Sequence, residues 1–191
     1  AGWALRARHP RSGRVAGLLK QLGLYEAPNF VVVGDHGHLP VRQVFHPNIL
    51  FREHGLLDAG ETGRVTSWKA YCHSAGLSAH VVLADPADEA VRRQVEALLQ
   101  SFVADESLGV EQVFTARQAR EQWHLAGPFQ YVLESREGTA FGNRCTGPVL
   151  QQADNTDYKI WVSAHGHLPT KGPQPTFFAA GPQVRPGVTV A

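Results

Sequence analysis

The chain has 191 residues, and its 18 Lys and Arg against 17 Asp and Glu give a formal net charge of +1 with histidine neutral. This length fits one domain of ordinary size with a small inserted subdomain. A composition of 43% apolar and 18% charged residues is typical of globular proteins and excludes a disordered chain. No apolar run approaches the ~20 residues that cross a bilayer, which excludes a membrane span. The near-zero net charge argues against a nucleic-acid partner.

Two counts are unusual, because the chain has ten histidines and no methionine. The number of histidines indicates metal binding or acid–base chemistry as functions to test. The chain begins at Ala1 and lacks a basic segment followed by an apolar one, so its N-terminus is not an intact signal peptide. We interpret it as a processed or trimmed chain or, preferably, as a fragment of a longer protein. Cys72 and Cys145 form neither a CxxC pair nor a disulfide framework, which favours a reducing cytoplasmic location.

The first 40 residues predict a helix, a strand and a loop, in that order. Apolar residues at three- and four-residue steps predict a helix over 13–24, which Gly23 and Pro28 would end. The β-branched run 30–33 (FVVV) is typical of a strand buried on both faces of a parallel sheet. It stops at the glycine-rich loop 34–40. In open α/β sheets, ligands bind at such loops beyond the carboxyl ends of the strands.

Residues 80–135 predict a compact strand–helix–strand–helix–strand unit. The expected strands are 80–83, 110–114 and 129–134, and the expected helices follow the capping residues Asp85 and Thr115. We interpret this unit as an α+β subdomain inserted into an α/β core that is formed by residues 1–79 and 136–191.

The pentapeptide His-Gly-His-Leu-Pro occurs twice, at 36–40 and at 165–169, and we call these the first and second HGHLP segments. Their flanks differ, so they are not a solenoid-type repeat; they predict two edges of one site. Asp35 and His36 directly follow the predicted strand. A carboxylate oxygen with an imidazole nitrogen suits zinc or manganese at ligand distances of ~2.0–2.2 Å. His165 repeats the pattern, although a structural turn or helix cap is the alternative for the Asp-His pair alone.

Two stretches, 29–40 (NFVVVGDHGHLP) and 163–182 (SAHGHLPTKGPQPTFFAAGP), together resemble the metal-binding half of the alkaline phosphatase superfamily. The closest branch is the type I phosphodiesterase/nucleotide pyrophosphatase family. The resemblance implies an α/β fold, with an alkaline-phosphatase-like sheet flanked by helices and the α+β subdomain inserted into it. It also implies that Asp35 and His36 bind one of two divalent metal ions, zinc or manganese, and that His165 binds the other.

The residues that precede these loops in that family have no credible match here. The family's Thr or Ser nucleophile and a further Asp ligand lie on an earlier strand, and an Asp-x-x-x-His ligand pair should precede the helix predicted at 13–24. His9 is the only upstream histidine, and Leu5 stands four positions before it, so we interpret His9 as a surface residue. The resemblance therefore implies the C-terminal part of the family, an incomplete ligand set, and a nucleophile upstream of Ala1.

The resemblance implies two-metal phosphoryl transfer, in which the ions activate the nucleophile and hold the attacking and leaving oxygens. The predicted function is that of a metal-dependent phosphoric ester hydrolase acting on a small phosphate ester or a nucleotide. We expect this chain alone to be inactive. His38, His73 and His167 are candidates for substrate contact, and a loop or packing role is the competing interpretation for each. The substrate, the metal and the oligomeric state do not follow from the sequence.

Three alternatives stay open. The first is a non-catalytic or truncated family member that keeps the fold and not the reaction. The second is a phosphomonoesterase or phosphonate hydrolase of the same superfamily. The third is a small metal- or ligand-binding module unrelated to hydrolysis. A natural chain that continues upstream with a Thr or Ser nucleophile and an Asp-x-x-x-His pair would favour the enzyme.

Overall fold

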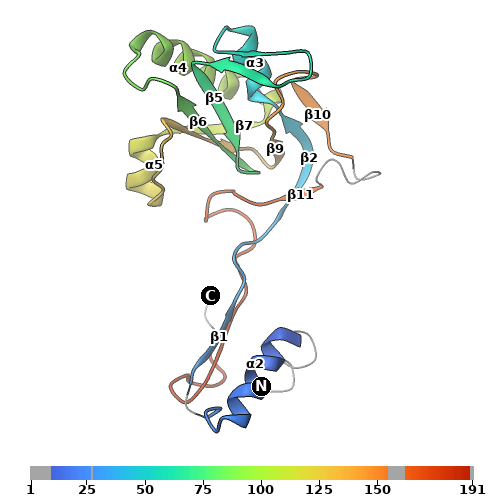
Figure 1. Cartoon of the computed structure of the whole chain (residues 1–191), viewed down its shortest axis with the longest axis vertical. Coiled ribbons are helices and arrows are strands. Elements are labelled where there is room, and N and C mark those ends of the chain that lie inside the picture. Colours follow the sequence, from blue (N-terminus) through green and yellow to red (C-terminus); the bar gives the residue numbers. More distant parts are fainter. Residues whose placement is uncertain (1–9, 27, 155–161, 190–191) are drawn as a thin grey trace. The chain divides into compact units, whose positions relative to one another are not determined.

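The computed structural model describes residues 10–26, 28–154 and 162–189, and Figure 1 shows its helices and strands, many of them labelled. The helices are α2 (Pro10–Gln21), α3 (Pro47–Glu53), α4 (Glu89–Ala104) and α5 (Ala116–Trp123), with a 3₁₀ turn η1 (Glu106–Leu108). The first six strands are β1 (Phe30–Val33), β2 (Leu39–Phe45), β3 (Leu57–Ala59), β4 (Val65–Trp68), β5 (Ala70–Ser74) and β6 (Ser78–Leu83). The others are β7 (Val110–Thr115), β8 (Tyr131–Ser135), β9 (Gly138–Phe141), β10 (Leu150–Gln152), β11 (Ser163–Ala164) and β12 (Phe177–Ala180).

The chain divides into two compact units. Residues 1–36 and 174–191 form the terminal unit, and residues 37–173 form the central unit. Within the described residues, no helix is long and apolar enough to span a membrane.

The terminal unit contains helix α2 and an antiparallel ribbon of β1 and β12. Phe30 lies opposite Ala180, and Val33 lies opposite Phe177. The predicted helix is confirmed, but it begins and ends three residues earlier than expected. The strand at 30–33 is also confirmed, whereas its placement in a doubly buried parallel sheet is wrong. Among the described residues it pairs antiparallel with β12, and Val31 and Val33 are 58% and 62% exposed. β-branched residues favour a strand, but the partner comes from a distant part of the chain that the local pattern does not specify.

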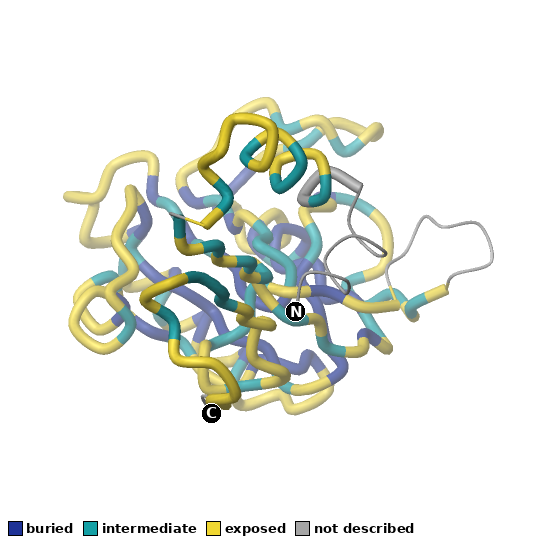
Figure 2. Tube along the Cα trace, turned by 90° about the horizontal axis from the view of Figure 1, so that it is seen from below, coloured by how far each residue is buried: buried dark blue, intermediate teal, exposed yellow. Residues whose placement is uncertain are grey.

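The main core of the central unit packs helix α4 against an antiparallel sheet in the order β5–β6–β8–β7. The apolar stripe of α4 is buried, as its helical spacing requires. It forms one cluster with apolar residues of the sheet, such as Val81 and Leu133. Phe45, Phe51 and Phe141 join the same cluster from β2, α3 and β9. Figure 2 shows the buried positions of the chain in dark blue.

Strand β2 organises a second sheet, in which it runs parallel to β9 and antiparallel to β10 and β11. Its first residues belong to the first HGHLP segment. Leu39 lies opposite Ala164, and Pro40 lies opposite Ser163. β2 therefore connects the first HGHLP segment to the chain that enters the second one.

The elements predicted within 80–135 are confirmed as β6, α4, β7, α5 and β8. Strand β5 belongs to the same sheet, and the predicted boundaries of an inserted subdomain at residues 80 and 135 stay a prediction. Thr115 caps α5 as predicted, and it forms a capping box with Gln118.

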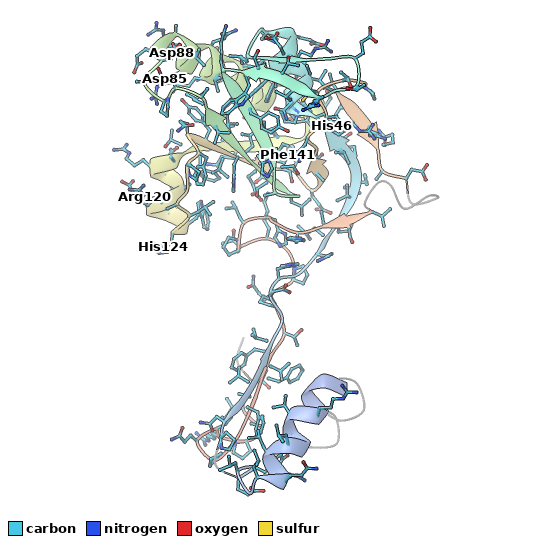
Figure 3. All side chains as sticks on the ribbon, viewed as in Figure 1. His46, Asp85, Asp88, Arg120, His124 and Phe141 are labelled. Atoms are coloured by element: carbon cyan, nitrogen blue, oxygen red, sulfur yellow. The ribbon has the colours of Figure 1, made fainter. Side chains whose placement is uncertain are left out.

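The predicted cap of α4 is wrong by three residues, because Asp88 and not Asp85 begins the helix (Figure 3). Asp88 Oδ1 accepts the backbone N–H groups of Ala90 and Val91, both at 3.0 Å. Asp85 instead accepts the N–H of Ala87 in the preceding turn. Both aspartates have the local hydrogen-bonding capacity that a cap needs, so the local sequence does not distinguish them.

Replacing Asp88 with Ala is expected to lower the free energy of unfolding by about 1 kcal/mol, because two N–H groups at the start of α4 lose their acceptor. Asp85→Ala is the matched control, and we expect it to cost less than half as much, since it removes one turn acceptor outside the helix. Urea unfolding followed by circular dichroism measures both values. Equal losses would contradict the cap assignment.

Candidate functional site

Asp35 and His36 follow β1 closely and lie side by side in the terminal unit. Asp35 Oδ1 accepts the backbone N–H of His36 at 3.0 Å, and Oδ2 lies 3.4 Å from His36 Nε2. The loop is tied to the start of β12, because the Gly34 N–H donates to the carbonyl of Thr176 at 2.8 Å. The side chains of Asp35 and His36 are 87% and 38% exposed. One oxygen and one nitrogen donor are therefore held together and remain accessible.

The spacing of these two donors fits the ligand geometry of one metal ion. Tetrahedral zinc with ligand bonds of ~2.1 Å places two of its donor atoms about 3.4 Å apart, which is the separation of Asp35 Oδ2 and His36 Nε2. Two donors do not fill a four-coordinate site. Within the described ranges, no group of three or more His, Cys, Asp or Glu side chains could hold a metal ion. Asp35 and His36 thus form one pair of donors with a fitting separation, and the incomplete ligand set stays a prediction.

Within the central unit, the end of the first HGHLP segment lies beside the start of the second. The pairing of β2 with β11 places His38 just before Leu39 and His165 just after Ala164, at the same end of the ladder. The centroids of the two imidazole rings are 5.4 Å apart. The contact brings His38 and His165 together, and the prediction that the two segments form two edges of one site stays a prediction. Asp35 and His36 belong to the terminal unit and His165 to the central unit, so the convergence of all three stays a prediction.

The second segment rests on the turn between β5 and β6, with almost no space between the two backbones. The Leu77 N–H donates to the carbonyl of His165 at 2.8 Å. A Cβ on Gly76 would come within 2.3 Å of that carbonyl oxygen, and a Cβ on Gly166 within 2.1 Å of the Ala75 carbonyl oxygen. Both glycines also have positive φ angles, +91° and +92°. Each position therefore requires glycine for both conformation and space.

A buried charge network holds the far end of the second segment. Glu134, in β8, has a side chain that is only 2% exposed, and its Oε1 accepts the backbone N–H of Leu168 at 3.1 Å. Lys171 Nζ lies 3.0 Å from Glu134 Oε1 and 2.5 Å from Glu111 Oε2, and it also donates to the Ser135 carbonyl at 2.8 Å. Sequence reasoning missed this network, because nothing in the local pattern distinguishes these charged residues from solvated ones.

The environment of the network shifts two pKa values. Burial raises the pKa of Glu134, and the bonds from Lys171 and Leu168 oppose this shift. Burial lowers the pKa of Lys171, but the hydrogen bonds to Glu111 and Glu134 outweigh it and leave the pKa raised. A cavity of about 300 Å³ lies beside the network and is lined by Lys171 and His167, among other residues. His167, predicted to contact substrate, therefore faces a space next to the charged pair.

His73 lies on β5, opposite His80 of β6. His73 is exposed, and its ring centroid is 6.4 Å from that of Tyr71. Burial lowers the pKa of His80, and the charge of His73 lowers it further. The ring of His80 packs on Phe129 with centroids 4.7 Å apart. Substrate contact by His73 stays a prediction.

Three further residues of the sequence are of interest, namely the two cysteines and His9. Cys72 and Cys145 are buried free thiols, and burial raises the pKa of both, which makes neither a ready nucleophile. His9 lies outside the described residues.

A family model described as type I phosphodiesterase/nucleotide pyrophosphatase matches residues 12–168. The chain belongs to this family. None of the curated proteins compared matches the chain. The matched range includes Asp35, His36 and His165, as well as the network residue Glu134.

Solved structures show the same fold. Human ectonucleotide pyrophosphatase/phosphodiesterase 5 matches with a TM-score of 0.56 and 17% identity, over 91% of this chain and 39% of that protein. The murine protein of the same name matches with a TM-score of 0.53 and 16% identity, over 90% of this chain and 38% of that protein. An inactive murine variant in complex with AMP gives a TM-score of 0.50 and 17% identity, with the same shares covered. The predicted alkaline-phosphatase-like α/β fold is confirmed, and the chain spans less than half the length of these phosphodiesterase relatives.

Replacing His73 with Gln is expected to raise the pKa of His80, because a positive charge that opposes protonation of the neighbouring ring is removed. Burial continues to hold this pKa below the ordinary value of 6.5. The stability that neutral His80 provides is complete above pH 6.5 and is lost as the pH falls toward the folded-state pKa.

Titration of the imidazole C–H signals by NMR measures this shift. His54→Gln is the control, since His54 lies at the end of α3 and bonds the Leu50 carbonyl. An unchanged His80 pKa in His73→Gln, or an equal change in the control, would contradict the assignment.

Proposed function

We propose that this chain provides metal-binding loops of a metal-dependent phosphoric ester hydrolase that acts on a small phosphodiester or nucleotide. The observation that carries the proposal is the Asp35–His36 pair, whose oxygen and nitrogen lie at the spacing of two ligands on one ion. Membership of the type I phosphodiesterase/nucleotide pyrophosphatase family gives the reaction class.

The proposed ligands are assigned to two ions, zinc or manganese. Asp35 and His36 hold one ion, and His165 contributes to the other. When bound, two such ions would neutralise the phosphate and stabilise the attacking and leaving oxygens of the displacement. The chain's part is to hold these donors in place, which the hydrogen bonds from Gly34 and Leu77 do at the two loops.

The phosphate ligand would be held by imidazole N–H groups. His38 is exposed beside His165, and His167 lines the neighbouring cavity. An imidazole N–H donates well to phosphate oxygen, and both rings lie within three residues of a proposed ligand. The AMP in the murine relative supports a nucleotide-sized phosphate compound as the ligand class. His73 is also proposed to contact the substrate, although it lies outside both HGHLP segments.

The proposal includes two further predictions from the sequence. No Thr or Ser of this chain has the family's nucleophile context, so the 191 residues alone are proposed to bind metal without turnover. The two cysteines are free and buried, which agrees with the proposed cytoplasmic location.

Replacing a proposed ligand is expected to weaken metal binding by about ten-fold or more, because each change removes one donor from a site with few of them. Asp35→Asn, His36→Gln and His165→Gln are compared with His54→Gln, the control histidine outside both HGHLP segments. Isothermal titration with Zn²⁺ and with Mn²⁺ measures the dissociation constants. Equal affinity of the wild-type chain and all four variants for the metal would contradict the ligand assignment.

The wild-type chain is expected to show no metal-dependent hydrolysis of bis-p-nitrophenyl phosphate above the buffer rate, although it binds the metal. Release of p-nitrophenolate is measured with Zn²⁺ or Mn²⁺ added. Clear turnover that disappears in Asp35→Asn and His165→Gln would show that this chain contains a complete catalytic centre. Such a result would agree with the proposed ligands and would contradict the prediction that this chain lacks a nucleophile.

A further inference from the structure

We propose that Glu134, together with Lys171, is a positioning residue that sets the direction of the His165 and His167 side chains in the second HGHLP segment. The inference rests on the proposed function for the identity of the ligand, and on contacts within the central unit for the positioning itself. Neither Glu134 nor Lys171 is one of the proposed metal or substrate residues.

The second segment is anchored at two points with the histidines between them. On the N-terminal side, the Leu77 N–H holds the carbonyl of His165, and the close approach of Gly76 and Gly166 fixes the separation of the two backbones. On the C-terminal side, Glu134 accepts the Leu168 N–H. Only two residues separate His165 from Leu168. A backbone stretch this short, fixed at both ends, has little freedom in φ and ψ, which fixes the directions of the Cα–Cβ bonds from which the two imidazoles extend.

Glu134 is suited to this anchor because its carboxylate is almost fully buried on a central strand. β8 lies between β6 and β7, so the carboxylate projects from a rigid part of the sheet. A buried carboxylate is costly unless its lone pairs are satisfied. Leu168 and Lys171 both contact Oε1, at 3.1 and 3.0 Å, and both partners come from the chain that follows the histidines. The cost of burying Glu134 is thus offset only when this part of the chain is in place.

Glu111 gives a matched comparison within the same network. Its side chain is 41% exposed and contacts Lys171 from the outer side, whereas Glu134 is 2% exposed. Removing the Glu111 charge leaves the Glu134–Leu168 and Glu134–Lys171 contacts in place. A role that is only electrostatic would respond to both carboxylates, whereas positioning responds to Glu134.

The main test variant is Glu134→Leu combined with Lys171→Met. Apolar replacement of a buried ion pair is often neutral for stability, so the double variant is expected to fold while the Leu168 N–H loses its acceptor. Glu134→Asp is the second variant, because it keeps the charge and withdraws the carboxylate by one methylene. Glu134→Gln is the rescue variant, because its amide oxygen still accepts the Leu168 N–H. Glu111→Gln is the control.

The measurements are made by NMR on the full chain, labelled uniformly with ¹⁵N and, in a second sample, with ¹³C in its histidines. They are the amide exchange rate of Leu168, the ring C–H shifts of His165 and His167, and the Zn²⁺ affinity reported by the His165 ring signal. In the double variant we expect exchange at least ten-fold faster, displaced signals for both rings, and Zn²⁺ binding weaker by about 10- to 100-fold. In Glu134→Asp all three quantities should change in the same direction by a smaller amount. In Glu134→Gln and Glu111→Gln the Leu168 exchange rate and the Zn²⁺ affinity should stay within about two-fold of the wild-type values.

Two results separate the positioning role from the proposed function. If Leu168 exchange accelerates in Glu134→Asp and the double variant while both ring signals keep their shifts, Glu134 is structural and the positioning proposal is overturned. If the wild-type ring signals do not respond to Zn²⁺, the metal assignment of His165 fails, and the ring shifts still decide whether Glu134 positions the histidines. If the double variant does not fold, Glu134→Asp supplies the same comparison.

Discussion

The pairing of β2 with β11 is the constraint on which the central unit's candidate site depends. These strands join residues at 39–40 to residues at 163–164, and the chain between them forms the remaining sheets and helices of the unit. Because Leu39 and Pro40 are fixed opposite Ala164 and Ser163, the residues at the open end of this short ladder are His38 and His165. The backbone register of β2 and β11 thus brings the end of the first pentapeptide to the start of the second. The same strand also pairs with β9 and β10, so the meeting point is built into the second sheet.

The second HGHLP segment must stay ordered although most of it is polar and lies at the surface. A loop with few apolar contacts gains little from the hydrophobic effect, and fixing each residue costs about 1–2 kcal/mol of backbone entropy. The structure supplies directional contacts instead, with Leu77 at one end and Glu134 at the other. Buried hydrogen bonds to a charged group are stronger than those between neutral groups, which makes a carboxylate an effective anchor. Lys171 then supplies the opposite charge that allows Glu134 to remain buried.

Local patterns predicted what depends on local physics. The helical spacing of apolar residues located α4, and the Thr-x-x-Gln sequence at 115–118 is the capping box that starts α5. The glycine-rich loop after 30–33 led to the Asp35–His36 pair and, with its repeat, to the family. The antiparallel partner of β1 was not predictable, because pairing depends on residues at 177–180. Asp85 and Asp88 carry the same cap chemistry, and the helix begins after Asp88, which lies three residues before Val91, the first buried residue of its stripe.

The charge network was equally inaccessible to sequence reasoning, since burial is what distinguishes Glu134 from the other acidic residues. The strand at 131–135 is buried at every position, so its carboxylate faces the protein interior and not solvent. An ionised group there would be strongly unfavourable without Lys171, which lies 37 positions later and has no local signal. One weak local signal does exist for the opposite anchor, because the second segment places Gly166 between two histidines. A Cβ at Gly166 would collide with the Ala75 carbonyl of the β5–β6 turn, and that turn lies about 90 positions earlier in the sequence, so the reason for the glycine is not visible locally.

The donors of the candidate site occur as two pairs, and this limits what either pair does alone. Asp35 and His36 supply one oxygen and one nitrogen in the terminal unit, and His38 and His165 supply two adjacent rings in the central unit. Of these residues, Asp35, His36 and His165 are the proposed metal ligands, and His38 is a proposed phosphate contact. A catalytic zinc needs three protein ligands and an open position, so the proposed ligands of neither unit are sufficient by themselves. Metal affinity in such a chain depends on how rigidly each donor is held, since the few ligands available must lose little freedom on binding. Rigid anchoring of the second HGHLP segment by Glu134 and Leu77 therefore matters more in this chain than it would in a site with a full set of ligands.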